Sequence, residues 1–163
     1  MNRCWHLVLV GVLIVACDTE NTADSRQSEA NAAVVQRLLD EVWVRQNVSA
    51  LNELLSPEYR YHANSFDTSG ETLQEARSGI ERDFREYSDI SIRVVDLFTT
   101  ADRGALQWIW RAVHNASGRP VEIHTNTVYR FEGGRIVEAW DGYDYTGVAL
   151  QLGYRIVPAD TAR

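Results

Sequence analysis

The sequence contains no lysine and only two cysteines in 163 residues, and the positions of the cysteines exclude several kinds of site. All sixteen basic residues are arginine, which we interpret as a composition bias of the genome and not as a sign of mechanism. The cysteines, Cys4 and Cys17, both lie in the first seventeen residues. The remainder of the chain therefore has no disulfide, no cysteine nucleophile and no cysteine metal site.

A positive charge excess is also lacking, because the formal net charge is −7. Proteins that bind nucleic acid contact phosphates mostly through clustered lysine and arginine, whereas the arginines here are scattered among more numerous carboxylates. An acidic surface is likewise not attracted to anionic lipid. We therefore expect no nucleic-acid partner, and membrane contact only through a dedicated anchor.

No apolar run is long enough to cross a membrane. The longest covers residues 7–16, and ten helical residues span about 15 Å of a hydrocarbon core that is roughly 30 Å thick. The run fits the apolar region of a signal peptide, and its end, Leu13-Ile14-Val15-Ala16-Cys17, resembles the lipobox of bacterial lipoproteins. We expect an exported protein of the cell envelope, anchored to the membrane by lipid on Cys17. The alternative is an ordinary secretory signal with an incidental cysteine.

These patterns divide the chain into four parts. Residues 1–16 are predicted to be the signal peptide. Residues 17–29 are polar and lack apolar periodicity, which predicts a disordered tether. Residues 30–155 are predicted to form one domain, and residues 156–163 a C-terminal tail.

Three helices are expected in the domain. Apolar residues recur at helical spacing over residues 34–43 and predict an amphipathic helix that ends near Asn47. A short helix over residues 49–55 would have Ser49 as its N-cap. Thr72-Leu73-Gln74-Glu75 has the form of a capping box and opens a third helix that continues to about Tyr87.

The other segments alternate like strands, and Gly133-Gly134 is a two-residue hairpin signal. Helices come first and a run of antiparallel strands follows, which indicates an α+β fold. The expected strands cover residues 58–63, 90–98, 105–113, 121–131 and 135–140.

Several segments match the pattern of a known family: Pro57-Glu58-Tyr59, His62, residues 88–90, residues 129–141, Asp144 and residues 150–153. Through these residues the chain resembles the SnoaL-like cyclases of the nuclear transport factor 2 superfamily. The resemblance spans roughly residues 34–153. It implies a cone-shaped, curved antiparallel sheet wrapped around the N-terminal helices, with a deep apolar pocket for a small hydrophobic molecule. It also implies catalysis by an Asp, often with a His, without cofactor or metal.

The resemblance points to Asp141, His62 and Asp144 as catalytic candidates. Strand alternation places Asp141 with Ala139 and Tyr143, on the face opposite Glu138 and Trp140. A carboxylate works as a general acid or base near neutral pH only if burial raises its pKa. The alternative is a structural role. One of the two acids would then cap a turn or pair with an arginine, and His62 would be a hydrogen-bonded residue at the pocket rim or in a turn.

Further residues are expected to bind the ligand, although aromatic residues in a small sheet protein are often simple core. Thr127 stands where many relatives carry an acidic residue or a histidine, and it cannot transfer protons near neutral pH. His124 lies three residues away, on the other face of a regular strand, and does not replace that group. The histidines lack paired ligand spacing, so no metal is expected. The expected ligand-binding residues are Tyr61, Thr127, Tyr129, Trp108, Trp110, Trp140, Tyr143 and His114.

Three functions remain open from the sequence. One is a cofactor-independent enzyme acting on a hydrophobic carbonyl, lactone or epoxide compound. Another is a lipoprotein that binds a small apolar ligand without chemistry. The third is an assembly module, such as a homodimer, that uses the open sheet face with the Trp and Ile side of the strand over residues 105–113.

Overall fold

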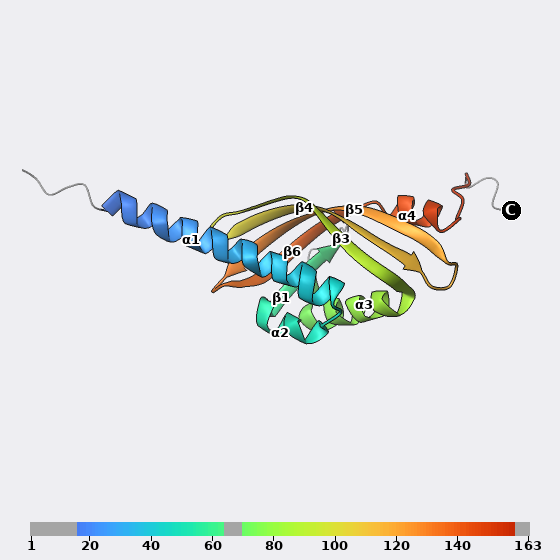
Figure 1. The fold of residues 1–163 in the computed structure, drawn as a ribbon, viewed down its shortest axis with the longest axis horizontal. Coiled ribbons are helices and arrows are strands. Elements are labelled where there is room, and N and C mark those ends of the chain that lie inside the picture. Colours follow the sequence, from blue (N-terminus) through green and yellow to red (C-terminus); the bar gives the residue numbers. More distant parts are fainter. Residues whose placement is uncertain (1–15, 64–69, 159–163) are drawn as a thin grey trace, which may run out of the picture.

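The computed structural model describes residues 16–63 and 70–158, and the expected signal peptide at residues 1–16 lies almost wholly outside this part. A curved sheet arches over the N-terminal helices and the helix over residues 73–86, and a short C-terminal helix lies at one end of the sheet (Figure 1). The helices are α1 (Ala16–Arg37), the π-helical η1 (Leu38–Val44), the 3-10 turn η2 (Val48–Ala50), α2 (Leu51–Leu54), α3 (Leu73–Glu86) and α4 (Tyr145–Gln151). The strands are β1 (Leu55–Ala63), β2 (Glu71–Thr72), β3 (Tyr87–Thr99), β4 (Arg103–His114), β5 (Arg119–Glu132) and β6 (Arg135–Tyr143).

The six strands form one sheet in the order β2-β1-β6-β5-β4-β3. This confirms the α+β fold class and the cone-shaped sheet, with one difference. Strand β1 runs parallel to β6, whereas all other neighbours are antiparallel. A hairpin can join only antiparallel strands, and β1 and β6 are separated by most of the chain. Register shifts in β1, β3 and the β5–β6 pair bend the strands and help to curve the sheet.

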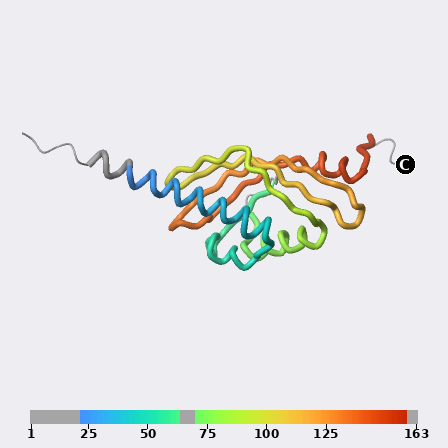
Figure 2. Tube along the Cα trace, viewed as in Figure 1, coloured from blue at the N-terminus to red at the C-terminus, as the bar shows by residue number. Residues whose placement is uncertain are grey.

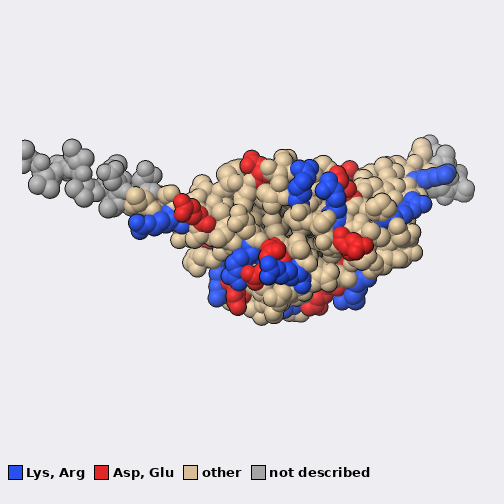
Figure 3. Space-filling view, in the orientation of Figure 1, with Lys and Arg blue, Asp and Glu red and all other residues tan. Residues whose placement is uncertain are grey.

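The helices cover the concave face of the sheet, and the tube view shows the same arrangement (Figure 2). The buried core lies between these two layers and combines aliphatic residues of η1 and α2 with aromatic residues of β4 and β5. Its largest fully buried side chains include Leu51, Leu54, Leu106 and Ile136. Acidic and basic side chains are intermingled on the face shown in Figure 3. Within the described residues, no helix is both long and apolar enough to span a bilayer.

Residues 17–29, which were expected to form a disordered tether, are helical in the structure. Helix α1 begins at Ala16 and runs through residues 17–29 without a break. Its later part is docked by polar contacts that periodicity does not reveal. Asn31 is completely buried, and its Nδ2 donates to the carbonyl oxygens of Thr100 and Ala101 in the β3–β4 turn at 2.9 and 3.0 Å. The Ser28 hydroxyl donates to the carbonyl oxygen of Thr99 at 2.7 Å.

Of the three short sequence signals for caps and turns, two are confirmed and one is wrong. The capping box at Thr72 and Glu75 is confirmed, with both reciprocal hydrogen bonds present. Ser49 is not an N-cap, because η2 occupies its position and its hydroxyl donates to Asn47 Oδ1 at 2.5 Å. The hairpin is confirmed: Gly133 and Gly134 have φ values of 56° and 74°, the left-handed conformation that such a turn requires. Helix α4 was not expected.

Candidate functional site

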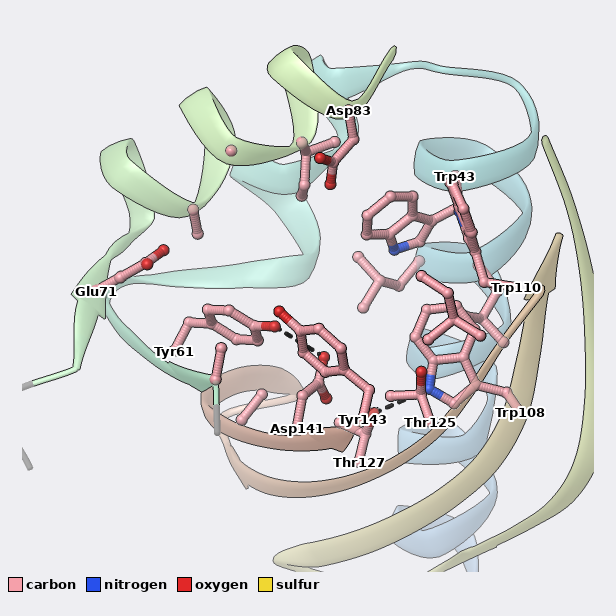
Figure 4. A pocket seen from close by; sticks show the side chains of 18 of the residues that line it. Trp43, Tyr61, Glu71, Asp83, Trp108, Trp110, Thr125, Thr127, Asp141 and Tyr143 are labelled. Atoms are coloured by element: carbon pink, nitrogen blue, oxygen red, sulfur yellow. Dashed lines mark hydrogen bonds between the residues drawn. The ribbon is translucent and has the colours of Figure 1, made fainter. Parts of the chain in front are cut away.

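A pocket of about 270 Å³ opens between the concave sheet face and the helices. Strands β1, β4, β5 and β6 supply one wall, and η1, α3 and the start of α4 supply the other. Figure 4 shows aromatic rings around this space, with the carboxylates of Asp83 and Asp141 on opposite sides of it. The rings that line it are Trp43, Tyr59, Tyr61, Tyr87, Trp108, Trp110, Tyr129, Tyr143 and Tyr145.

Asp141 lies in this pocket, as strand alternation predicts. Ala139 and Tyr143 line it as well, whereas Glu138 and Trp140 do not. The Tyr61 hydroxyl donates a hydrogen bond to Asp141 Oδ2 at 3.0 Å (Figure 4). The other oxygen, Oδ1, is buried and has no hydrogen-bond partner among the described residues. One oxygen of the carboxylate is thus held by Tyr61, whereas the other is buried without a partner among the described residues.

Burial raises the pKa of Asp141 to about 6, and the hydroxyls of Thr127 and Tyr61 limit the rise. Thr127 is its partner across the β5–β6 pair. The pKa of the Tyr61 hydroxyl is raised above its ordinary value, first by burial and then by the charge of Asp141. Tyr61 therefore remains a donor, while Asp141 changes charge close to neutral pH, which suits a general acid or base.

Four of the expected ligand-binding residues lie together on β4 and β5. Thr127 is buried, and its Oγ1 accepts the indole N–H of Trp108 at 3.0 Å. Tyr129 is buried beside them, and burial raises the pKa of its hydroxyl. Trp110 also lines the pocket, and its indole N–H is buried without a partner among the described residues. The residues that line the pocket thus include one buried, unpartnered donor and one buried, unpartnered acceptor.

Asp83 is a pocket residue that the sequence analysis missed. It lies on α3, and its carboxylate is directed into the pocket from the wall opposite Asp141 (Figure 4). Burial raises its pKa to about 6, while neighbouring Arg82 opposes the rise. A signal was available: Asp83 follows Ala76 by seven residues and Ile80 by three, so a carboxylate interrupts the apolar stripe of this helix.

His62 and Trp140 lie outside the pocket lining, and the expectation that they face the ligand is corrected. Tyr61 points inward, so its neighbour His62 must point to the opposite face of β1. There His62 Nε2 lies 2.9 Å from Glu138 Oε1, and its ring stacks on Trp140 with centroids 5.4 Å apart. His62 therefore does not join Asp141 in the pocket.

Asp144 and His114 also lie outside the pocket. Asp144 is the N-cap of α4, and its Oδ1 accepts the backbone N–H of Gly147 at 2.9 Å. This is the turn-cap role that the sequence left open for one of the two acids. His114 ends β4, with Nδ1 2.8 Å from Ser117 Oγ in the β4–β5 turn. The two residues satisfy local polar groups, so Asp141 is the sole one of the three catalytic candidates that lines the pocket.

His124 does not compensate for Thr127. It is exposed on the outer face of β5, with Nε2 2.8 Å from Glu122 Oε1. Within residues 16–63 and 70–158, no group of three or more acidic, histidine or cysteine side chains has the geometry to hold a metal ion. The chemistry that the pocket can perform with its own groups is proton transfer and hydrogen bonding in a largely apolar, aromatic surrounding.

Comparison with known proteins identifies the family. The family model described as SnoaL-like polyketide cyclase matches residues 33–152. A comparison with curated protein sequences finds no match.

The fold is shared with solved structures at low identity. TsrD from Streptomyces laurentii is 22% identical, with a TM-score of 0.68 over 77% of this chain and 96% of TsrD. AclR from Streptomyces galilaeus is 20% identical, with a TM-score of 0.70 over 82% of this chain and 91% of AclR. IdmH from Streptomyces antibioticus is 22% identical, with a TM-score of 0.66 over 76% of this chain and 99% of IdmH. Since the family model covers most of the domain, the chain belongs to the SnoaL-like polyketide cyclase family.

Proposed function

We propose that this protein is a cofactor-independent enzyme that moves a proton on a hydrophobic carbonyl, lactone or epoxide compound, with Asp141 as the acid/base group. The observation that carries the proposal is the buried Asp141 carboxylate, which has one free oxygen inside an aromatic pocket. Its pKa of about 6 allows both protonation states near neutral pH. The family name supports this type of chemistry but does not choose the reaction.

The two unpartnered polar groups of the pocket complement a carbonyl compound. Asp141 Oδ1 can accept a proton from carbon or a hydroxyl, and the Trp110 indole N–H can donate a hydrogen bond to an oxygen. Developing negative charge on that oxygen would be stabilised more strongly in this apolar surrounding than in water. Tyr61 holds Asp141 in position through Oδ2. His62 and Asp144 have no part in this version of the mechanism, because both lie away from the pocket.

The proposal is tested by the elementary step that cyclisation and isomerisation share. Proton NMR in deuterium oxide would follow exchange of the α-protons of β-tetralone, and hydrolysis of styrene oxide would test the epoxide class. Asp141→Asn should reduce either catalysed rate to the uncatalysed background, while Asp144→Asn, the same change three residues away, should leave it intact. Equal rates for the wild type and Asp141→Asn on both probes would overturn the enzyme proposal.

The second candidate is ligand binding without chemistry. One observation favours it: the protein groups that act on Asp141 are the hydroxyls of Thr127 and Tyr61, and the raised pKa of Tyr61 makes it a poor proton donor or relay. A stable complex without turnover would decide for binding. An assembly role alone is less well supported, because the pocket is open and contains carboxylates. Its expected surface is also covered: Trp108 and Trp110 face the pocket, and Ile109 is buried.

We further propose that the domain is held at the cell envelope by lipid on Cys17. The proposal is supported by the apolar run at residues 7–16 and the lipobox-like sequence that ends at Cys17. Mass spectrometry of the protein purified from membranes should find the mature chain starting at a diacylated Cys17. Cys17→Ala should move the protein from the detergent phase to the aqueous phase in Triton partitioning. An unmodified N-terminus beyond Cys17 would indicate an ordinary secretory signal.

A further inference from the structure

The ionisable groups around the pocket are mostly acidic. Among the described residues that line it, Glu71, Asp83 and Asp141 carry carboxylates, and Arg82 is the single cationic side chain. The charge of Arg82 opposes the rise of the Asp83 pKa, but no ion pair within 4.0 Å joins the two side chains. The pocket thus has an excess of negative charge that the protein itself does not balance.

Asp83 differs from Asp141 because its carboxylate has no hydrogen-bond partner among the described residues. It is half-buried on the apolar side of α3, and none of the described residues forms a hydrogen bond or ion pair with its carboxylate. A carboxylate removed from water without a partner is costly, so such groups in proteins are normally paired or serve a function. Tyr61 fixes Asp141 at the opposite wall, and nothing comparable fixes Asp83.

The surface around Asp83 also suits a cation. Trp43 lies next to it in the upper part of the pocket (Figure 4). The Trp43 ring forms an edge contact with Phe84, the residue after Asp83, at a centroid distance of 5.9 Å, and a tilted contact with Trp108 at 6.2 Å. Trp43 thus connects the Asp83 end of α3 with the aromatic wall of β4. The faces of indole and phenol rings attract organic cations, and tryptophan does so most strongly. A neutral apolar ligand would use these rings but leave Asp83 unpaired.

We propose that Asp83 binds a positively charged amino group of the substrate, while the reactive part of the same molecule lies against Asp141. This inference deepens the proposed function, on which it rests, by naming a substrate class: hydrophobic compounds with a basic amine. The aromatic rings between the two walls hold the apolar body of the molecule. Asp83 acts here as a specificity-determining residue and takes no part in the proton transfer.

Two nearly isosteric probes test the proposal: phenethylamine, which is cationic at neutral pH, and phenethyl alcohol, which is neutral. Quenching of tryptophan fluorescence would report binding, since Trp43, Trp108 and Trp110 line the pocket. The amine should bind about 10- to 100-fold more tightly than the alcohol, as a hydrogen bond to a charged partner allows. Asp83→Asn should remove this preference and leave the affinity for the alcohol unchanged. Circular dichroism would confirm that the variant is folded.

Glu86→Gln is the matched control, because it removes an exposed carboxylate from the same helix close to Asp83 and should keep the preference. An unchanged preference in Asp83→Asn, or no amine binding by the wild type at millimolar concentration, would overturn the inference. Loss of the preference in Asp141→Asn instead would place the cation at Asp141 and also overturn it. These binding assays need no turnover, so their failure is distinct from failure of the exchange and hydrolysis assays that test the proposed function.

Discussion

Replacing Asp141 by asparagine should stabilise the protein near neutral pH, although it removes the proposed catalytic group. Burial raises the pKa of Asp141 from 3.8 to about 6, so the folded state binds the proton more tightly than the unfolded state does. The protonated acid is therefore well tolerated at low pH. As the pH rises from 3.8 to about 6, the folded state loses stability relative to one with a neutral side chain, and above this window the loss is constant.

The size of the effect follows from the same pKa values. One pKa unit corresponds to about 1.4 kcal/mol, so the rise from 3.8 to about 6 corresponds to about 3 kcal/mol. Because Asp141 is only partly buried as a whole residue, solvent reduces this figure, and a gain of about 1–3 kcal/mol is expected. Asparagine retains an oxygen that can accept the Tyr61 hydroxyl, so the variant keeps that hydrogen bond.

Urea denaturation followed by tryptophan fluorescence would measure the free energy of unfolding near neutral pH and at about pH 3, where most of the carboxyl is protonated in both the unfolded and the folded state. The gain for Asp141→Asn should be present near neutral pH and nearly absent in acid. Asp144→Asn is the control, since asparagine is as good an N-cap as aspartate. A loss of stability for Asp141→Asn, or a gain of equal size at both pH values, would refute the argument that burial raises the pKa.

Two further substitutions test the contacts that position the site and the first helix. Tyr61→Phe removes the hydrogen-bond donor to Asp141 and should raise the carboxyl pKa above its value of about 6, which would shift the pH profile of proton exchange to higher pH. The control Tyr154→Phe, at an exposed position, should leave the profile unchanged. An unshifted profile for Tyr61→Phe would exclude the contact between Tyr61 and Asp141. Asn31→Ala removes two hydrogen bonds to the β3–β4 turn and should lower the free energy of unfolding in urea by about 2–4 kcal/mol. The exposed Gln36→Ala on the same helix should change it by less than about 0.5 kcal/mol, and equal effects would show that α1 is not docked through Asn31.

The alternation of side chains along a strand correctly placed the candidates on β6, but the same rule was not applied to those on β1. Alternation along β6 placed Asp141, Ala139 and Tyr143 on one face, and the pocket contains all three. The same rule separates Tyr61 from His62, since adjacent strand residues face opposite ways. The resemblance to relatives favoured both residues, but the strand can direct only one of them inward.

Local sequence was sufficient for features whose energetics are local. The capping box at Thr72 satisfies backbone N–H groups within one turn, and Gly133-Gly134 adopts positive φ values that few other residues tolerate. Apolar periodicity, too, is a local property, and it correctly indicated the amphipathic helix that begins with the capping box and the strands that follow. These elements, with the order of helices and strands, determined the fold class.

Only the tertiary structure decided which acidic residues have a raised pKa. The pKa of a carboxyl depends on how much protein surrounds it, and for Asp141 and Asp83 that protein comes from segments far apart in the sequence. The parallel pairing of β1 with β6 brings Tyr61 to Asp141 across eighty residues of sequence separation. Docking of α1 through Asn31 likewise depends on a turn about seventy residues away. The sequence by itself determined the local elements and the direction of Asp141, while burial and long-range contacts, which are sums over the whole chain, made a pocket with two perturbed carboxylates.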